Sequence, residues 1–171
     1  MSKESEAGQL PNADAFKAAS VPKTPEITRL ARRAFSDLCA GARLAVEYLL
    51  ADDKISTVDG QTKESIQVQL FPLTFPEGST IEDDDLLDLL DRTTDLLCGL
   101  GEHYHNRDQF RHAEMLWRHY LAIQSQTAGI ESQSVRWSAV MLRRALLAQD
   151  KRAEADQIVI LFTQNASTRR M

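Results

Sequence analysis

All four histidines of the chain lie between His103 and His119, and their type and spacing could do chemistry. Imidazole groups ligate zinc and transfer protons near neutral pH. His112 and His119 are seven residues apart and share one face of a helix, while Glu102 and His105 fall on an earlier segment. Because a zinc site needs about three or four converging ligands, these spacings are weak signals. A small metal-dependent or acid–base enzyme built on Glu102, His105 and His112 is therefore our alternative hypothesis.

Signatures of catalysis are otherwise missing from the sequence. The chain contains no glycine-rich phosphate loop, no G-x-S-x-G and no H-E-x-x-H. The two cysteines, Cys39 and Cys98, lie far apart and match no metal-binding spacing, so we expect reduced thiols. We therefore predict that the protein is not an enzyme and binds no metal or cofactor.

The composition excludes several classes of partner. Hydrophobic residues make up 43% of the chain and charged residues 26%, which is typical of a globular protein. The net charge of −5 argues against nucleic acid, because phosphate binding needs a basic face. The segment Met1–Gly8 is polar, and charges interrupt every apolar run that could cross a bilayer. We expect a cytoplasmic protein with no nucleic-acid and no membrane partner.

The elements that must position the histidines are two helices within Leu97–Ile123, separated by the polar break Asn106-Arg107-Asp108. Four residues of the first helix share one face: Leu97, Leu100, Gly101 and Tyr104. The second helix carries an apolar stripe that includes Ala113 and Trp117. We expect the small residues Gly101 and Ala113 to let the two backbones approach closely, with Trp117 beside the contact.

This segment resembles a tetratricopeptide repeat. The family pattern is an aromatic residue or leucine, then Leu-Gly, then Tyr, and after the turn an Ala followed four residues later by an aromatic residue. Here the pattern reads Leu97-x2-Leu100-Gly101-x2-Tyr104 and then Ala113-x3-Trp117. Tyr120 departs from it, because the family usually keeps a small residue there, and the repeat-ending proline after Ile123 is missing. The resemblance implies antiparallel helical hairpins stacked as part of an α-solenoid.

A second, degenerate copy of the pattern lies 42 residues further on. Four pairs overlay at this spacing: Leu100 with Leu142, Tyr104 with Leu146, Ala113 with Ala155, and Trp117 with Val159. The common repeat has about 34 residues, so the spacing resembles the longer repeats of kinesin light chains and related bacterial proteins. Arg143 stands in the place of Gly101. Since a solenoid wants about three repeats, an N-terminal helix or a second copy of the chain must supply another layer.

The N-terminal third of the chain divides by composition. Residues 1–23 have little to bury and are expected to form a disordered tail. Residues 24–52 are expected to form one helix, because Thr24-Pro25-Glu26 is a helix start and apolar residues then recur every three or four positions. Residues 53–78 are expected to form a small β-hairpin insertion around Asp59-Gly60, with Ser65–Leu70 as its alternating second strand.

Residues 79–164 are expected to hold the helical repeats, and residues 165–171 a frayed tail. The repeats begin at Asp83-Asp84-Asp85, whose carboxylates suit the positive end of a helix dipole. A helix from Asp83 to Asn106 would be unusually long, so a break near Arg92-Thr93-Thr94 is left open.

In this family the first helix of each repeat lines a concave groove, where partners usually lie. By this resemblance the groove residues are Asp95, Glu102, His105, Asn106, Trp137, Val140 and Arg144, with Cys98 and Leu147 beside them. The resemblance puts His112 and His119 on the outer side of the second helix. The clamp that some members use for chaperone C-terminal carboxylates needs lysines, asparagines and an arginine, so Cys98 and Glu102 argue against that ligand. Trp137 is the expected anchor, since tryptophan is enriched in binding hot spots.

We therefore predict a mainly α, tetratricopeptide-like protein that holds another protein or a peptide in its groove. It would serve as an adaptor, a dedicated chaperone or a subunit of a larger assembly. A third hypothesis is a self-assembling structural subunit, in which the degenerate end repeat stacks on its twin in a homo-oligomer.

Overall fold

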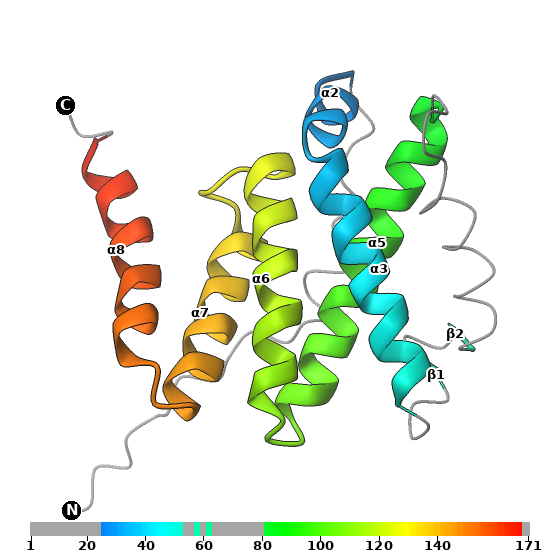
Figure 1. Cartoon of the computed structure of the whole chain (residues 1–171). Coiled ribbons are helices and arrows are strands. Elements are labelled where there is room, and N and C mark those ends of the chain that lie inside the picture. Colours follow the sequence, from blue (N-terminus) through cyan, green and yellow to red (C-terminus); the bar gives the residue numbers. More distant parts are fainter. Residues whose placement is uncertain (1–24, 53–56, 59–60, 63–80, 169–171) are drawn as a thin grey trace, which may run out of the picture.

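Six helices make up most of the described part of the chain, which confirms the mainly α fold class (Figure 1). The computed structural model describes residues 25–52, 57–58, 61–62 and 81–168 of the 171. The helices are α2 (Pro25–Arg33), α3 (Phe35–Ala51), α5 (Asp83–His105), α6 (Phe110–Thr127), α7 (Gln133–Ala148) and α8 (Arg152–Thr168). From α5 to α8, neighbours in sequence are neighbours in space, so two helical hairpins form a row that ends in α8.

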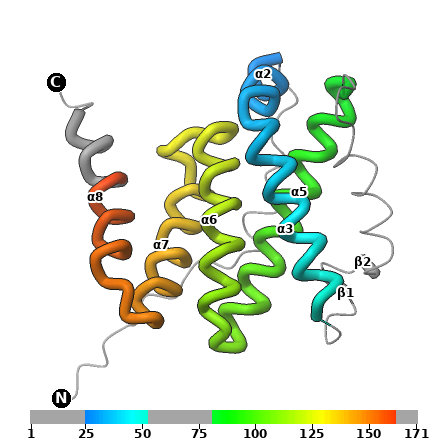
Figure 2. The backbone as a smooth tube through the Cα atoms, viewed as in Figure 1, coloured from blue at the N-terminus to red at the C-terminus, as the bar shows by residue number. Residues whose placement is uncertain are grey.

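The N-terminal helix predicted over 24–52 is broken in two. At Ala34 the backbone leaves the helical conformation (φ −85°, ψ 6°), and the chain turns sharply from α2 into α3 (Figure 2). Ala31 and Ala34 are fully buried, so small side chains let the bend lie close against its neighbours. Just before the bend, Arg32 of α2 pairs with Asp83, and this ion pair attaches α2 to the start of α5.

The long helix α5 runs without the break that we left open near Thr93-Thr94. Both threonines are buried, and the Thr94 hydroxyl donates to the Leu90 carbonyl oxygen at 2.8 Å. A hydroxyl that bonds to the preceding turn satisfies itself inside the helix and needs no other partner. Thr94 is therefore compatible with a continuous buried helix, whereas the buried Thr93 Oγ1 has no hydrogen-bond partner among the described residues.

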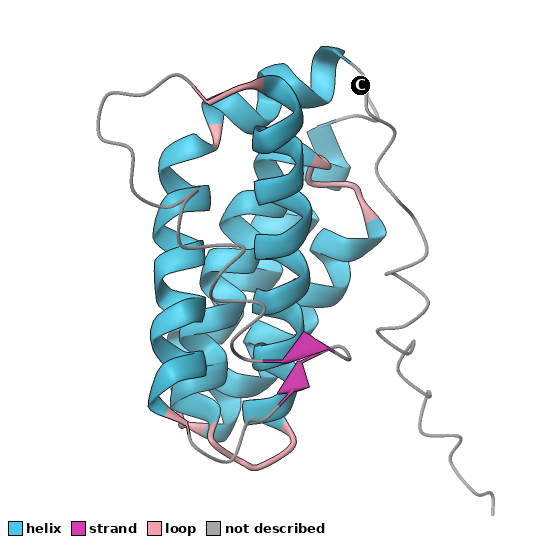
Figure 3. Ribbon diagram, turned by 90° about the vertical axis from the view of Figure 1, so that its right-hand side faces the viewer, coloured by secondary structure: helices cyan, strands magenta, loops and turns pink. Residues whose placement is uncertain are grey.

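The two strands are much shorter than the predicted insertion. β1 (Thr57–Val58) pairs antiparallel with β2 (Gln61–Thr62), with Thr57 opposite Thr62 (Figure 3). The longer strand expected over Ser65–Leu70 lies outside the described residues, so the β-hairpin insertion over 53–78 is not supported beyond these two-residue strands. The predicted tail over 1–23 also lies outside them. At the other end α8 continues to Thr168, past the expected start of the frayed tail, because no proline or glycine interrupts 163–168.

The contact between α5 and α6 is made by a glycine and an indole. A Cβ built on Gly101 would lie 2.8 Å from the Cε2 and Cζ2 atoms of Trp117. We expected Gly101 and Ala113 to bring two backbones together; instead, Gly101 makes room for the fully buried ring of Trp117. That ring also packs edge-to-face against Trp137 of α7, with 5.0 Å between the centroids.

The α5–α6 and α7–α8 turns have the same geometry at a spacing of 42 residues. In each turn one aspartate has a left-handed backbone: φ is 57° at Asp108 and 60° at Asp150. The backbone bonds also correspond: the Tyr104 carbonyl accepts from Arg107 (3.2 Å) and Gln109 (2.9 Å), and the Leu146 carbonyl accepts from Gln149 (3.1 Å) and Lys151 (3.0 Å). Two segments with different side chains therefore close their hairpins in the same way.

Helix α3 adds a further layer to the first hairpin. It packs on both α5 and α6, so α6 is covered by α3, α5 and α7 (Figure 1). Its buried side is made of Leu38, Gly41, Ala42, Ala45 and Leu49. This is the layer that we expected the N-terminal helix to supply. At the other end of the row, α8 packs mainly on α7.

Candidate interaction surface

The α5 and α7 positions that the sequence assigned to a groove form what we call the α5–α7 face, and the two helices approach each other where Arg144 acts on His105. Its residues are Asp95, Glu102, His105, Asn106, Val140, Arg144 and Leu147. Asp95, Asn106 and Arg144 are exposed, Glu102 and His105 are half-buried, and the apolar pair Val140 and Leu147 is 43% and 39% exposed. The face thus offers apolar surface between side chains of both charges.

His105 and Arg144 join the two helices of this face. The pKa of His105 is lowered mainly by burial, and the nearby Arg144 guanidinium lowers it further. Asp108 acts to raise it. The His105 ring also meets Phe110 edge-to-face at 5.2 Å. Its buried Nδ1 has no hydrogen-bond partner among the described residues. The sequence resemblance placed His105 and Arg144 in one groove, and the structure places them within electrostatic reach of each other.

Beneath the α5 side of this face lies Tyr120 of α6. Burial raises the pKa of its hydroxyl, and Cys98, Asp95 and Glu102 raise it further through their negative charge. Three of the expected α5 groove positions are therefore gathered over one buried ring. Tyr120 was noted in the sequence only as a departure from the family pattern, and its large ring fills the space that a small residue would leave.

Trp137 does not belong to the exposed part of this face. Its side chain is only 6% exposed and packs against Trp117. We expected a surface anchor here, and that expectation is wrong. Burying the indole between α6 and α7 removes a large apolar area from water. This is more favourable for the unbound protein than leaving the ring exposed on its surface.

Asn106 caps the C-terminus of α5 and does not lie within the helix. It follows His105 as the C-terminal cap, where its backbone N–H donates to the Glu102 carbonyl at 2.9 Å. Its exposed side chain lies at the edge of the α5–α7 face, beside the turn to α6.

The histidines of the cluster face two different directions. His105 lies toward α7, whereas His112 stacks on Tyr104 at 5.1 Å and meets Tyr48 of α3 at 5.3 Å. The Nε2 of His103 lies 3.5 Å from an Asp52 carboxylate oxygen at the end of α3. The catalytic set Glu102, His105 and His112 is therefore not brought together. Within the ranges that the structure describes, no three His, Cys, Asp or Glu side chains converge as metal ligands.

The resemblance put His112 and His119 on an open outer side of α6; His112 is exposed there, but His119 is only half-exposed. Helix α3 lies over it, so burial lowers the pKa of His119, while Asp37 of α3 acts to raise it. Burial raises the pKa of Tyr104 to about 12, and the charge and hydrogen bond of Asp52 act in the same direction. These side chains hold α3 against the hairpin.

A buried carboxylate, which sequence reasoning missed, ties the α7–α8 turn to α6. Glu114 accepts from Arg118 (2.9 Å), from the Lys151 ammonium (2.7 Å) and from the Gln149 amide (2.8 Å). Burial by itself raises the pKa of Glu114, but these three hydrogen bonds and the Arg118 charge outweigh it and lower the pKa. The four-residue spacing of Glu114 and Arg118 on one helix is the part of this cluster that the sequence could indicate. The other two partners, Gln149 and Lys151, come from the end of α7 and the turn that follows it.

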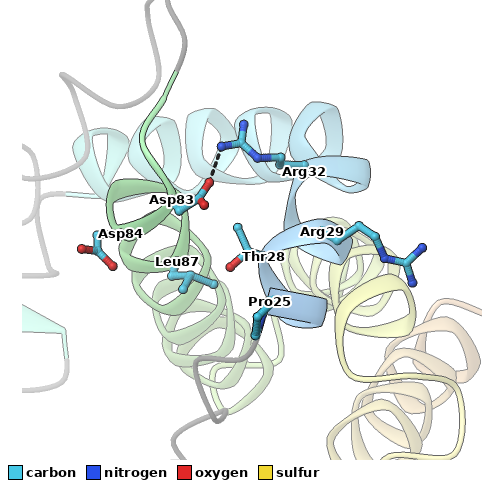
Figure 4. Close-up of a pocket in the computed structure, with 7 residues that line it drawn as sticks. All are labelled: Pro25, Thr28, Arg29, Arg32, Asp83, Asp84 and Leu87. Carbon is cyan, nitrogen blue, oxygen red and sulfur yellow. Dashed lines mark hydrogen bonds and ion pairs between the residues drawn. The ribbon is translucent and has the colours of Figure 1, made fainter.

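A cavity of about 460 Å³ lies between α2 and the start of α5 (Figure 4). Pro25, Thr28 and Leu87 lie around it, and Arg32 pairs with Asp83 across one side. Arg29 and Asp84 also line the cavity, on opposite sides of it. None of the residues of the α5–α7 face lines it.

No family model matches the chain, and neither a curated protein nor a solved structure matches it. Among the described helices none has the length and apolar character needed to span a membrane.

Proposed function

We propose that this chain is a tetratricopeptide-like interaction module, which holds another protein or a peptide on the α5–α7 face. Its role would be that of an adaptor, a dedicated chaperone or a subunit of a larger assembly in the cytoplasm, with no catalytic step of its own. The observation that supports the proposal is the pair of hairpins with matching turns, together with the electrostatic reach between His105 of α5 and Arg144 of α7.

The chemistry of the α5–α7 face suits a polypeptide ligand of mixed character. Val140 and Leu147 offer apolar contact, Arg144 offers a cation, and Asp95 with Glu102 offers two carboxylates. Polar and charged residues around a small apolar centre are the usual arrangement of a protein–protein interface. The opposed charges of Glu102 and Arg144 would select a partner that carries both signs in a matching order.

Charge reversal on the α5–α7 face tests this proposal. A chain with Glu102→Lys and Arg144→Glu keeps its net charge, and neither residue is fully buried. The matched control is Arg33→Glu with Glu47→Lys, which makes the same exchange at exposed positions of α2 and α3. Each chain is immobilised and used to capture proteins from a native extract, after circular dichroism has shown that it is folded.

The proposal expects proteins that the wild type and the control retain and that the Glu102→Lys/Arg144→Glu chain loses. Equal retention by both variants would contradict it, because binding would then lie elsewhere on the molecule. Retention of nothing by the wild type would also count against an interaction role.

A further inference from the structure

The bend between α2 and α3 interrupts a sequence that favours one continuous helix. Neither proline nor glycine occurs between Glu26 and Ala40, so no local signal ends the helix there. One apolar stripe also continues across the bend at helical spacing, and its members are Ile27, Leu30, Ala31, Ala34, Leu38, Ala42, Ala45 and Leu49. The local sequence therefore favours a straight helix over 25–51, and the bend must come from tertiary contacts.

The bend removes three helical hydrogen bonds from the backbone. On one side the Ala34 N–H donates to the Leu30 carbonyl at 3.0 Å, and on the other the Leu38 N–H donates to the Ala34 carbonyl at 2.8 Å. A continuous helix would make three further bonds between these two, from the N–H groups of residues 35, 36 and 37 to the carbonyls of residues 31, 32 and 33. Those three bonds are absent among the described residues. Straightening the bend would form them.

The contacts that hold α2 in the bent position are weak. All of its residues are described, and Ala31 alone among them is buried, while Ile27 packs partly against the core. Arg32 pairs with Asp83 and donates to the Ile81 carbonyl at 3.4 Å, but the two charged side chains are 50% and 63% exposed. Exposed ion pairs stabilise a fold little. In addition, the cavity of about 460 Å³ lies between α2 and the start of α5 (Figure 4).

We propose that α2 is a switch helix with two positions. In the bent position it packs on α5 and α6, as Figure 1 shows. In the straight position it continues α3 as one helix over 25–51 and uncovers the parts of α5 and α6 on which it packs. The three hydrogen bonds that straightening forms offset the lost burial of Ala31 and the lost Arg32–Asp83 pair. Both positions are therefore populated, and a small change in either set of contacts shifts the balance between them.

The ion pair makes the switch sensitive to ionic strength. Salt screens exposed charges, so a high salt concentration weakens the Arg32–Asp83 pair and favours the straight position. None of the residues of the α5–α7 face belongs to α2 or lines the cavity beside it. The switch therefore does not depend on the proposed function.

The distance between two spin labels, one on each helix, tests the switch. Glu26→Cys on α2 and Glu47→Cys on α3, both at exposed positions, are labelled in a Cys39→Ser chain, whose remaining Cys98 is buried. At 1.5 Å per residue, a straight helix places the two backbones about 32 Å apart, and the bend brings them closer. Pulsed electron double resonance is expected to show both distances, with the share of the longer one rising at high salt.

Removing the charge of Asp83 is expected to favour the straight position. Asp83→Asn should raise the ratio of straight to bent chains severalfold and abolish its dependence on salt. Asp88→Asn is the matched control, because Asp88 is also on α5 but pairs with Arg92 of the same helix at 2.8 Å. It is expected to keep the ratio of the wild type.

Weakening the helix at the bend is expected to favour the bent position. Ala34→Gly should lower the ratio of straight to bent chains about fivefold, because glycine is unfavourable inside a helix and acceptable at a helix start. Ala40→Gly is its control, since this exposed position lies inside α3 in both forms and its effect on them is equal.

Circular dichroism first establishes which variants are folded, and if Asp83→Asn is not, the salt series of the wild type decides. A wild type that gives one distance at low and at high salt overturns the proposal. So does an Asp83→Asn chain with the same ratio as Asp88→Asn, or an Ala34→Gly chain that shifts the ratio no further than Ala40→Gly.

Discussion

The indole of Trp117 occupies the space that a side chain at position 101 would need. A Cβ on Gly101 would lie 2.8 Å from two indole carbons, a separation that real Cβ atoms essentially never show. The same ring packs edge-to-face against Trp137. One fully buried side chain thus joins α5, α6 and α7, and it positions the two helices whose exposed sides make the α5–α7 face.

Gly101→Ala is expected to destabilise the fold. Overpacking costs about 1–3 kcal/mol, and the better helix propensity of alanine offsets about 1 kcal/mol of it. Gly41→Ala is the matched control, since the closest atoms to its Cβ would be the methyl ends of Ile123 and Leu97, at 3.0 and 3.1 Å, which can move. Urea unfolding is expected to rank Gly101→Ala below Gly41→Ala by about 1 kcal/mol or more. The reverse order would contradict the packing described here.

Glycine at either turn aspartate is expected to stabilise the protein. Asp108 and Asp150 both have φ near 60°, a region that costs a non-glycine residue about 1 kcal/mol. Asp108→Gly and Asp150→Gly should each raise the free energy of unfolding by up to about 1 kcal/mol, and valine at the same sites should lower it. Because equivalent backbone hydrogen bonds close both turns, the two glycine substitutions should change the free energy of unfolding in the same direction. Opposite signs would show that the turns are not equivalent.

Glu114→Gln is expected to destabilise the α7–α8 hairpin in a pH-dependent way. Breaking a buried ion pair costs about 3–5 kcal/mol, but solvent screens Arg118 and Lys151, which are 40% and 37% exposed, so we expect about 2 kcal/mol.

The sign of the pH dependence follows from the lowered pKa of Glu114. Its stabilising contribution is fully present above the ordinary value of 4.5 and is lost as the pH falls through the lower folded value. Denaturant unfolding at several pH values should therefore show the stability difference between wild type and Glu114→Gln shrinking as the pH falls below about 4.5. A constant difference would mean that Glu114 is not the carboxylate that titrates.

Arg144→Glu is expected to raise the pKa of His105. The Arg144 guanidinium lowers that pKa in the wild type, and a carboxylate in its place would favour the protonated imidazole. An NMR titration of the imidazole protons measures the change directly, with Arg136→Glu, also on α7, as a control. An unchanged His105 titration in Arg144→Glu would contradict the electrostatic reach between Arg144 and His105.

Much of the helical arrangement could be predicted from local patterns. The 3.6-residue periodicity, the polar break Asn106-Arg107-Asp108 and the 42-residue spacing led to α5–α8. The bend at Ala34 could not be predicted, because no proline or glycine marks it. It results from α2 turning to pack on the start of α5, which is a contact between residues about 50 positions apart.

The candidate site was predictable only where helical phase decides it. Helical phase placed Glu102, His105 and Arg144 off the buried sides of their helices, and in the structure none of the three is fully buried. It could not decide between burial and exposure for Trp137, since a residue near the edge of an apolar stripe turns inward or outward according to its neighbour's shape. That neighbour is Trp117, and the space for it depends on Gly101. Likewise, His119 is half-buried only because α3 lies over α6.

The most direct test of the interaction role is photo-cross-linking from the α5–α7 face. A photoreactive amino acid at Val140, which is 43% exposed, is compared with the same group at Leu50, which is 46% exposed on α3. After irradiation in native extract, the account predicts a discrete cross-linked partner from position 140, and its loss when Glu102→Lys and Arg144→Glu are added. A partner captured equally from position 50, or one that survives the charge reversal, would contradict the claim that this face is the binding surface.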